Sequence, residues 1–166
     1  MLPNGIATIG RQAFRECTSL TEITLPTTLT NIDECAFLGC SSLTSLTFPA
    51  SLTTIGCNAF YSCSSLAHLD FSALTAAVTI GSAAFADCER LVKLTLPAAL
   101  SRIECSTFSR CKRLVEVTLP AALEHIDKLA FDCCYKLKTL IFPAAPRLTY
   151  VGNQAPMWTP CTSHKS

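Results

Sequence analysis

The sequence predicts a solenoid, a chain that winds in similar coils around one long hydrophobic core. Three observations support this prediction. A motif recurs about every 23 residues, apolar and polar residues alternate as they do in short strands, and one repeat is too small to be stable alone. The 166 residues are enough for one domain of ordinary size.

Phenylalanine marks the period of the repeat. Successive copies are 23 residues apart, with one step of 25, at Phe14, Phe37, Phe60, Phe85, Phe108 and Phe131. A cysteine follows each Phe by three residues, a leucine follows that cysteine by three, and an isoleucine precedes each Phe by five. The unit reads P-x-x-L-x-x-I-x-x-x-A-F-x-x-C-x-x-L-x-x-L-x-L, and six copies in register establish a repeat protein.

A short strand is expected near the end of each unit. In the first copy Leu20, Ile23 and Leu25 read L-x-x-L-x-L, and Ile23 and Leu25 alternate with Thr24. This alternation predicts a strand whose apolar residues point inward while Thr24 faces solvent. Pro26 ends the strand pairing because it has no N–H to donate.

The rest of the unit predicts turns or short helical segments. Leu29 and Ile32 are three residues apart, which favours a turn or a short 3₁₀-like segment. Ala36, Phe37 and Cys40 suit one helical turn on the far side of the coil. Because one coil buries too little apolar surface to offset the entropy of ordering its backbone, the coils must stack, with parallel strands about 4.8 Å apart.

Two irregularities interrupt the period. The longer step between Phe60 and Phe85 places two extra residues within 72–78, and we expect them to bulge on the loop side without moving the core register. Leu2 and Pro3 already match the end of a strand. We therefore expect the chain to begin within a repeat and to be a fragment of a longer protein.

The repeats account for nearly the whole chain. We assign residues 1–155 to the solenoid, as about six repeats and a partial seventh, and residues 156–166 to a C-terminal tail. The tail contains Met157 and Trp158, and we expect it to fold over the open end as a simple cap. Without caps, the ends of the solenoid would expose apolar side chains and unpaired strands, which favours end-to-end self-association.

The repeat unit resembles the BspA-type, or Treponema-type, leucine-rich repeat. Departures are modest: Thr107 replaces the usual Ala, and Asp33, Glu104 and Asp127 replace the usual Gly. The resemblance implies an α/β leucine-rich-repeat solenoid, right-handed, with a parallel β-sheet on the concave face and short turns or 3₁₀ or helical segments on the convex side. It also implies a surface or secreted protein that binds macromolecules, and it brings no catalytic residues and no cofactor.

Composition excludes several classes of protein. Hydrophobic residues make up 49% of the chain and charged residues 15%, which argues against disorder. A net charge of +1 argues against a nucleic-acid binder. No apolar run is long enough for membrane insertion, and no secretory signal is recognisable, so localisation stays open although the resemblance favours the cell surface.

The eleven cysteines predict a structural role for most of these thiols. Six belong to the repeat and should form a column of buried, small apolar side chains. Neighbouring cysteines of this column are close enough for disulfides, but their side chains should run parallel. Metal binding is not expected, because the sequence has no C-x-x-C motif and no cluster of histidines.

A Ser–His–Asp group provides the one argument for an enzyme. His68 and Asp70 share one side of a predicted strand, and Ser45 occupies the His68 position one coil earlier. A hydrolase would use such a group as a catalytic triad. The repeat offers no oxyanion hole and no enclosed pocket, so we predict that the protein is not an enzyme.

The outward side chains of the strands are the candidate binding residues. They have no role in the core and can vary freely from coil to coil. We predict a protein or glycoprotein partner on this concave face, and alternatively a structural spacer in a larger surface protein. The candidate residues are Glu22, Thr24, Ser45, Thr47, His68, Asp70, Lys93, Thr95, Glu116 and Thr118.

Charge differs between the two halves of the chain. Residues 1–83 carry a net charge of −3 and residues 84–166 a net charge of +4. Four of the basic residues recur just before successive strands, at Arg90, Lys112, Arg113 and Lys136. They could line one rim and attract an anionic partner such as an acidic protein or glycan, or serve only as solubilising charge.

Overall fold

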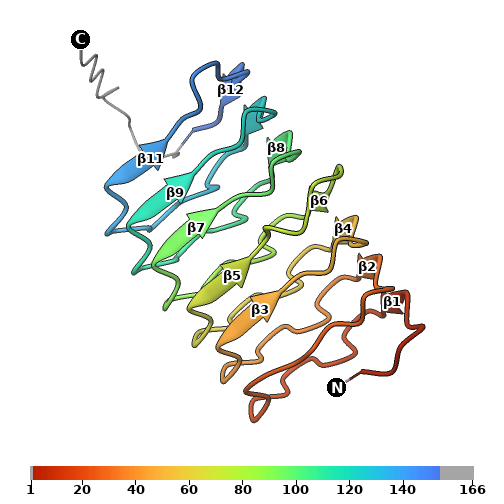
Figure 1. Ribbon diagram of the computed structural model, residues 1–166. Coiled ribbons are helices and arrows are strands. Elements are labelled where there is room, and N and C mark those ends of the chain that lie inside the picture. The colour runs from red at the N-terminus through yellow and green to blue at the C-terminus, as the bar shows by residue number, and fades with distance from the viewer. Residues whose placement is uncertain (1, 154–166) are drawn as a thin grey trace.

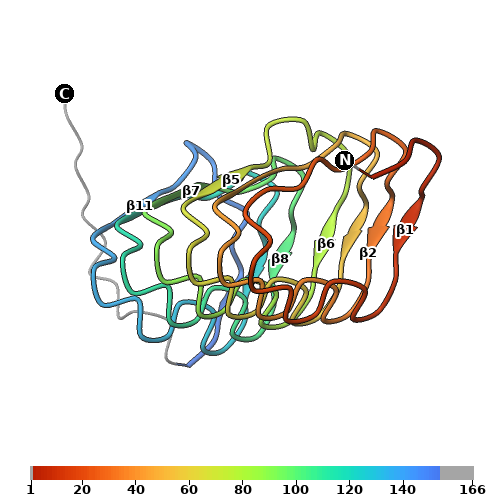
Figure 2. The ribbon, with the colours of Figure 1, turned by 90° about the horizontal axis from the view of Figure 1, so that it is seen from below.

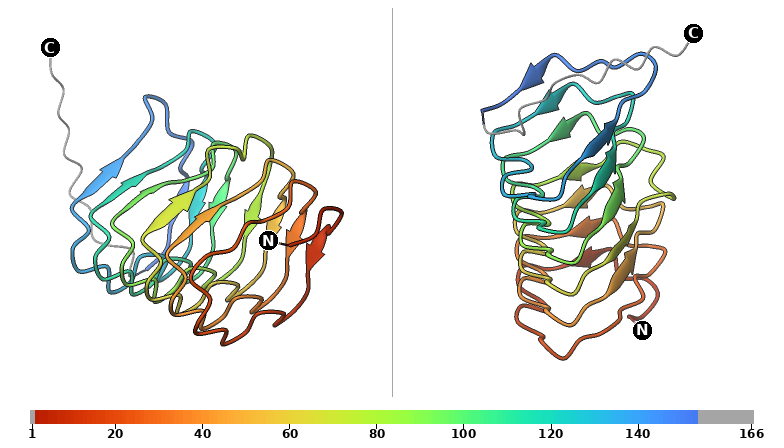
Figure 3. Two further views of the ribbon diagram at one scale, coloured as in Figure 1. Left: turned by 60° about the horizontal axis from the view of Figure 1, so that its bottom comes forward. Right: turned by 90° about the vertical axis from the view of Figure 1, so that its left-hand side faces the viewer.

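The computed structural model describes residues 2–153, which wind into coils stacked along one axis (Figure 1). The predicted solenoid is confirmed. Each coil has three sides, two of them formed by parallel strands and the third by turns (Figure 2). The coils follow one another from the end that carries β1 to the end that carries β12 (Figure 3). The predicted tail, residues 156–166, lies outside the described residues.

The first side, which we call the front sheet, contains the predicted strands. They are β3 (Ser45–Thr47), β5 (His68–Asp70), β7 (Lys93–Thr95), β9 (Glu116–Thr118) and β11 (Thr139–Ile141). The pairing is parallel and in the predicted register, so that Ser45 lies opposite His68. The middle residue of each strand points toward the core and its neighbours point outward, as the alternation predicts.

A second sheet, the side sheet, contains Ile32, which was expected to belong to a turn or 3₁₀-like segment with Leu29. Its two-residue strands are β1 (Thr8–Ile9), β2 (Asn31–Ile32), β4 (Thr54–Ile55), β6 (Thr79–Ile80), β8 (Arg102–Ile103), β10 (His125–Ile126) and β12 (Tyr150–Val151). The expected turn is present at Leu29, whose N–H donates to the Pro26 carbonyl at 3.1 Å, but Ile32 lies in a strand because backbone groups there bond to the next coil. The Gly56 N–H, for example, donates to the Ile32 carbonyl at 2.7 Å.

The helical segments expected around Ala36, Phe37 and Cys40 are also absent. The described residues of the third side form turns and contain no helix. Within each coil, amides alternate between partners: Leu38 N–H donates to Cys35 in the same coil at 3.2 Å, whereas Phe37 N–H donates to Ala59 of the next coil at 2.7 Å. Bonding between coils therefore takes the donors that a helix would use internally.

Left-handed residues accompany this alternation. The residues two before and two after each Phe of the repeat have positive φ, between 53° and 61° for those that are not glycine. Two such residues per coil prevent the right-handed turns from joining into a helix. They are Gln12, Glu16, Cys35, Gly39, Asn58, Ser62, Ala83, Asp87, Ser106, Arg110, Leu129 and Cys133.

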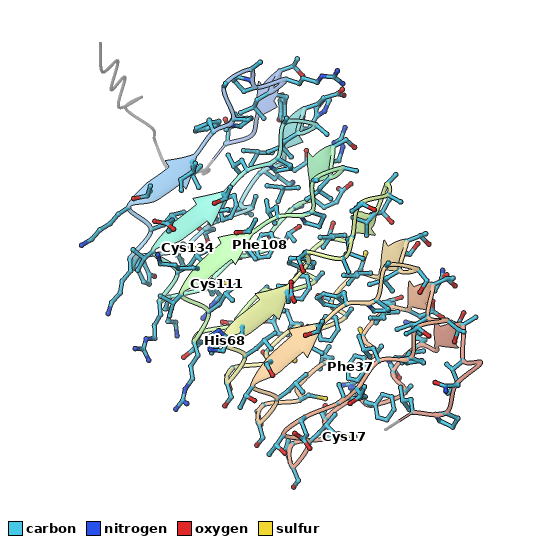
Figure 4. The ribbon with its side chains drawn as sticks, viewed as in Figure 1. Cys17, Phe37, His68, Phe108, Cys111 and Cys134 are labelled. Carbon is cyan, nitrogen blue, oxygen red and sulfur yellow. The ribbon has the colours of Figure 1, made fainter. Side chains whose placement is uncertain are left out.

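The repeated phenylalanines form one continuous stack inside the solenoid. Successive rings from Phe14 to Phe131 have centroids 5.0 to 5.7 Å apart and planes within 11° of parallel. Figure 4 labels Phe37 and Phe108 in this stack. Phe48 and Phe71 stack beside it at 4.9 Å and approach Phe85 edge-on. This arrangement confirms the predicted core row.

The repeated cysteines form a second column beside the phenylalanines. Each buried thiol donates to the carbonyl of the Phe one coil earlier, at 3.1 to 3.5 Å. The buried members are Cys40, Cys63, Cys88, Cys111 and Cys134. Cys17, the sixth member, is exposed, contrary to the prediction, because the first coil has a stacked neighbour on one side only.

The two extra residues change more than a loop. Among residues 2–153, strand pairing stops between β5 and β7 on the front sheet and between β6 and β8 on the side sheet. We call this interruption the seam. The core register is kept, as predicted, since the Phe60 and Phe85 rings remain stacked at 5.2 Å. The loop 72–78, yellow-green in Figure 2, projects from the stack beside the seam.

Replacing Gly81 by alanine should destabilise the fold by about 1–3 kcal/mol. A Cβ there would lie 2.6 Å from the Cys57 nitrogen and 2.8 Å from the Gly56 carbonyl carbon, so the neighbouring backbone would have to move. Gly10 occupies the same repeat position with open space around it, and Gly10→Ala should change stability by less than about 0.5 kcal/mol. Urea unfolding of both variants tests the prediction; equal effects would contradict it.

Candidate interaction face

The front sheet displays most of the predicted binding residues. Ser45, Thr47, His68, Lys93 and Thr95 are exposed on three successive strands. Asp70 is also exposed, whereas Glu116 and Thr118 on β9 are half-buried. Glu22 and Thr24 are exposed but do not lie in a strand, so the strand predicted for the first copy is absent. The front sheet begins one coil later, at β3.

A groove of about 580 Å³ follows the seam on the front sheet. His68 and Asp70 line it from β5, and Lys93 and Thr95 line it from β7. The inserted loop adds Ser72 and Thr75 to the wall. We call this the seam groove. Four predicted residues from two coils therefore meet in one concave site.

A second groove, of about 550 Å³, lies toward the N-terminal end. It brings together four other predicted residues, Glu22, Thr24, Ser45 and Thr47. Ala73 of the inserted loop also lines it. Glu116 and Thr118 line neither groove.

The inserted loop was missed as part of the site. Its residues Ser72, Ala73 and Thr75 line the two grooves. The available signal was the longer step at this point together with Ser72, which occupies the position where the other copies have proline. A position without proline can donate its backbone N–H, and Ser72 does so.

Asp70 connects the front sheet to the inserted loop. Its Oδ1 accepts the Ser72 backbone N–H at 2.9 Å. The side-chain and backbone hydrogen bonds from Ser72 lower the pKa of the Asp70 carboxyl, although burial opposes this slightly. The carboxylate thus orders the start of the loop that walls the seam groove.

Replacing Asp70 by alanine should lower the free energy of unfolding by about 1 kcal/mol, because the Ser72 N–H loses its acceptor. Since the pKa is lowered, the contribution of the carboxylate is present above its ordinary range near pH 4 and is lost as the pH falls through that range. Thr47→Ala, one coil earlier in the same column, should have no such pH-dependent effect. Urea unfolding at pH 7 and pH 3 tests both variants.

The possible triad is not assembled. Ser45 lies opposite His68 on the neighbouring strand, but no hydrogen bond joins Ser45, His68 and Asp70 within residues 2–153. Asp70 is instead bonded to Ser72. The side chains lie on an open sheet, where nothing excludes water from a reacting group.

In the described part of the chain, no three His, Cys, Asp or Glu side chains are grouped as metal ligands would be. None of the described residues belongs to a helix with the length and apolar character to span a membrane.

A third groove, of about 500 Å³, lies where the chain enters β5 and β7. Ala67 and Val92 line it together with His68, Lys93, Arg90 and Arg113. Two predicted basic residues, Arg90 and Arg113, thus lie beside the front sheet. Lys93 Nζ lies 3.3 Å from Glu116 Oε1 and pairs with it. Lys112 instead pairs with Glu89 at 2.6 Å.

Comparison with protein families identifies the repeat. A family model described as "BspA type Leucine rich repeat region (6 copies)" matches residues 1–78 and 78–164. The chain belongs to the BspA-type leucine-rich repeat family. Its members are generally protein-interaction scaffolds and the fold is typically non-enzymatic.

Solved structures of bacterial leucine-rich repeat proteins share this BspA-type fold. A protein from Bacteroides ovatus is 34% identical over 93% of this chain, with a TM-score of 0.78. The T. pallidum leucine-rich repeat protein is 29% identical over 91%, with a TM-score of 0.80. A protein from Eubacterium ventriosum is 28% identical over 92%, with a TM-score of 0.78.

The BspA-type chain is shorter than these proteins. It spans 39%, 71% and 40% of the B. ovatus, T. pallidum and E. ventriosum chains, respectively. No curated protein matches the sequence.

Proposed function

We propose that this BspA-type protein binds a protein or glycoprotein through the front sheet, with the seam groove at the centre of the contact. The observation that carries the proposal is the meeting of His68, Asp70, Lys93 and Thr95 with the inserted loop in one groove. Rigid strands hold these side chains, so binding them loses little conformational entropy. A role at the cell surface, in adhesion or host contact, is consistent with this proposal.

Polar variety within the groove supports a selective contact. An imidazole, a carboxylate, an ammonium group and a hydroxyl face one open space from two neighbouring strands. Half-buried Leu69 and exposed Ala98 add apolar surface to the groove. Interfaces typically combine such an apolar centre with polar groups that fix orientation.

Site-specific photo-crosslinking tests the proposal. A benzophenone amino acid is placed at exposed Thr95 on the front sheet or, as the matched control, at exposed Thr79 on the side sheet. Each protein is irradiated in extracts of the native environment. We expect one macromolecule to be crosslinked from Thr95 and not from Thr79. After purification, it should bind Thr95→Arg at least about tenfold more weakly than the wild type, because bulk and charge fill the groove.

Three outcomes would overturn the proposal. Crosslinking from Thr79 alone would place the partner on the side sheet. Unchanged affinity of the purified partner for Thr95→Arg would show that the seam groove is not in the contact. A protein that crosslinks from neither position would behave as a structural spacer.

A further inference from the structure

We propose that the corner beside the front sheet binds an acidic protein segment in which carboxylates are interleaved with aliphatic side chains. This inference rests on the proposed function and names the chemistry of one part of the partner. The site, which we call the basic strip, has a floor of one residue per coil, Ala67, Val92 and Val115, each directly before a front-sheet strand. Arg90 and Arg113 line one groove with Ala67 and Val92, and Lys136 occupies the same repeat position one coil further on.

The floor of the basic strip is apolar and accessible. Val92 is 38% exposed, one of the few large hydrophobic side chains on the described surface. Ala67 and Val92 line the groove of about 500 Å³, and its remaining lining residues are His68, Lys93, Arg90 and Arg113. No carboxylate lines this groove. A ligand lying there would contact hydrocarbon below and the unpaired cations Arg90 and Arg113 beside it.

The bordering cations have no acidic partner of their own. Within residues 2–153, carboxylates pair with Lys93 and Lys112, whereas no carboxylate lies within ion-pair distance of Arg90, Arg113 or Lys136. Since coils are about 4.8 Å apart, the three side chains form a closely spaced row of like charge. Their mutual repulsion falls when an anionic chain lies along the row.

The cations begin at the seam. At the same repeat position the first three coils carry Ser19, Ser42 and Ser65, and the next three carry Arg90, Arg113 and Lys136. A general solubilising role would not require charge at one corner of one half of the solenoid. The sharp change instead defines where a bound acidic segment would start.

An acidic peptide fits the basic strip better than an anionic glycan does. Sugar hydroxyls held over Ala67, Val92 and Val115 would lose water without gaining a side-chain hydrogen-bond partner. Aliphatic side chains gain by burial on the same floor. In an extended peptide, alternate residues are about 6.7 Å apart, and the flexible stems of arginine and lysine can adapt their 4.8 Å spacing to it.

Fluorescence anisotropy with synthetic probes tests the inference. The first probe is a labelled peptide of alternating glutamate and valine, and the second replaces valine by serine. The third is a labelled sulfated oligosaccharide. We expect the glutamate–valine peptide to bind most tightly and its affinity to fall at high salt.

Charge-reversal variants locate the site. Arg113→Glu should weaken binding of the glutamate–valine peptide at least about tenfold, because it places a carboxylate beside the bound acid. The matched control is Lys128→Glu, which makes the same change in net charge at an exposed residue between the side sheet and the turns. It should alter affinity less than about twofold. Val92→Ser should remove the preference for valine over serine.

Three results would overturn the inference. They are no binding of the glutamate–valine peptide, tighter binding of the oligosaccharide, and equal weakening by Arg113→Glu and Lys128→Glu. The first result would mean that the basic strip does not bind such a peptide. The second would mean that it binds glycans instead, and the third that peptide binding depends only on the net charge of the protein. Crosslinking from Thr95 can succeed in each case, so failure here is distinguishable from failure of the proposed function.

Discussion

Raising the pH from 8 to 10 should lower the free energy of unfolding of this protein by about 5 kcal/mol. Burial raises the pKa of Cys40 from 9.0 to about 11, and burial also raises the pKa of Cys63 and of Cys88. A hydrogen bond with Cys134, together with burial, raises the pKa of Cys111. Above pH 9 the unfolded thiols lose their protons, whereas the folded thiols keep most of theirs because their pKa values are raised. Stability is therefore complete below that pH and is lost as the pH rises.

Urea unfolding under reducing conditions at the two pH values measures this loss. Cys88→Ala removes one buried thiol, so its loss of stability between pH 8 and pH 10 should be smaller than that of the wild type by about 1 kcal/mol. Cys57→Ala is the control, because Cys57 is exposed. If Cys88→Ala loses as much stability as the wild type, the buried thiols do not cause the alkaline sensitivity.

Phe85→Ala should destabilise the solenoid by about 3–5 kcal/mol. The Phe85 side chain is fully buried and lies at the centre of the aromatic core. Its ring stacks on Phe60 at 5.2 Å and on Phe108 at 5.7 Å, and the edges of Phe48 and Phe71 approach it. Removing the ring would leave a cavity in the core beside the seam, where no strand pairing holds the neighbouring coils together.

The matched control is Phe14→Ala in the same column. Phe14 is half-buried and stacks on one ring, Phe37, so its loss should be clearly smaller than that of Phe85. Urea unfolding monitored by circular dichroism compares the two variants. Equal losses would mean that the column does not act as a continuous stack.

Side-chain periodicity predicted the parts of the fold that depend on burial. The Phe and Cys columns and the front-sheet register followed from spacing alone, because residues at equal positions in stacked coils must contact each other. Cys17 was misplaced because a repeat pattern does not reveal that an end coil has one neighbour.

Backbone bonding explains the remaining differences. The side sheet and the turns depend on which coil accepts each N–H. The spacing of apolar side chains does not determine which coil that is. Leu29 and Ile32 are three residues apart in either conformation. Positive φ at residues such as Cys35, Ala83 and Leu129 cannot be predicted from the sequence either, because these residue types do not favour it.

The candidate site was predicted in part. The outward positions on β3, β5 and β7 followed from strand alternation. The seam groove did not, because the prediction treated the insertion near Ser72 as a simple bulge. In the structure, it coincides with the end of strand pairing and adds a wall to the site.

Stacking of each coil only on its immediate neighbours, through hydrogen bonds on the turn side and strand pairing everywhere except at the seam, gives this architecture a further property. The contacts of one coil end at its immediate neighbours, so the geometry at one point of the stack does not depend on how many coils lie beyond it. In-frame duplication or deletion of a whole repeat could therefore lengthen or shorten the molecule while leaving existing surfaces intact. Evolution can thus adjust the reach of such a protein separately from what it recognises.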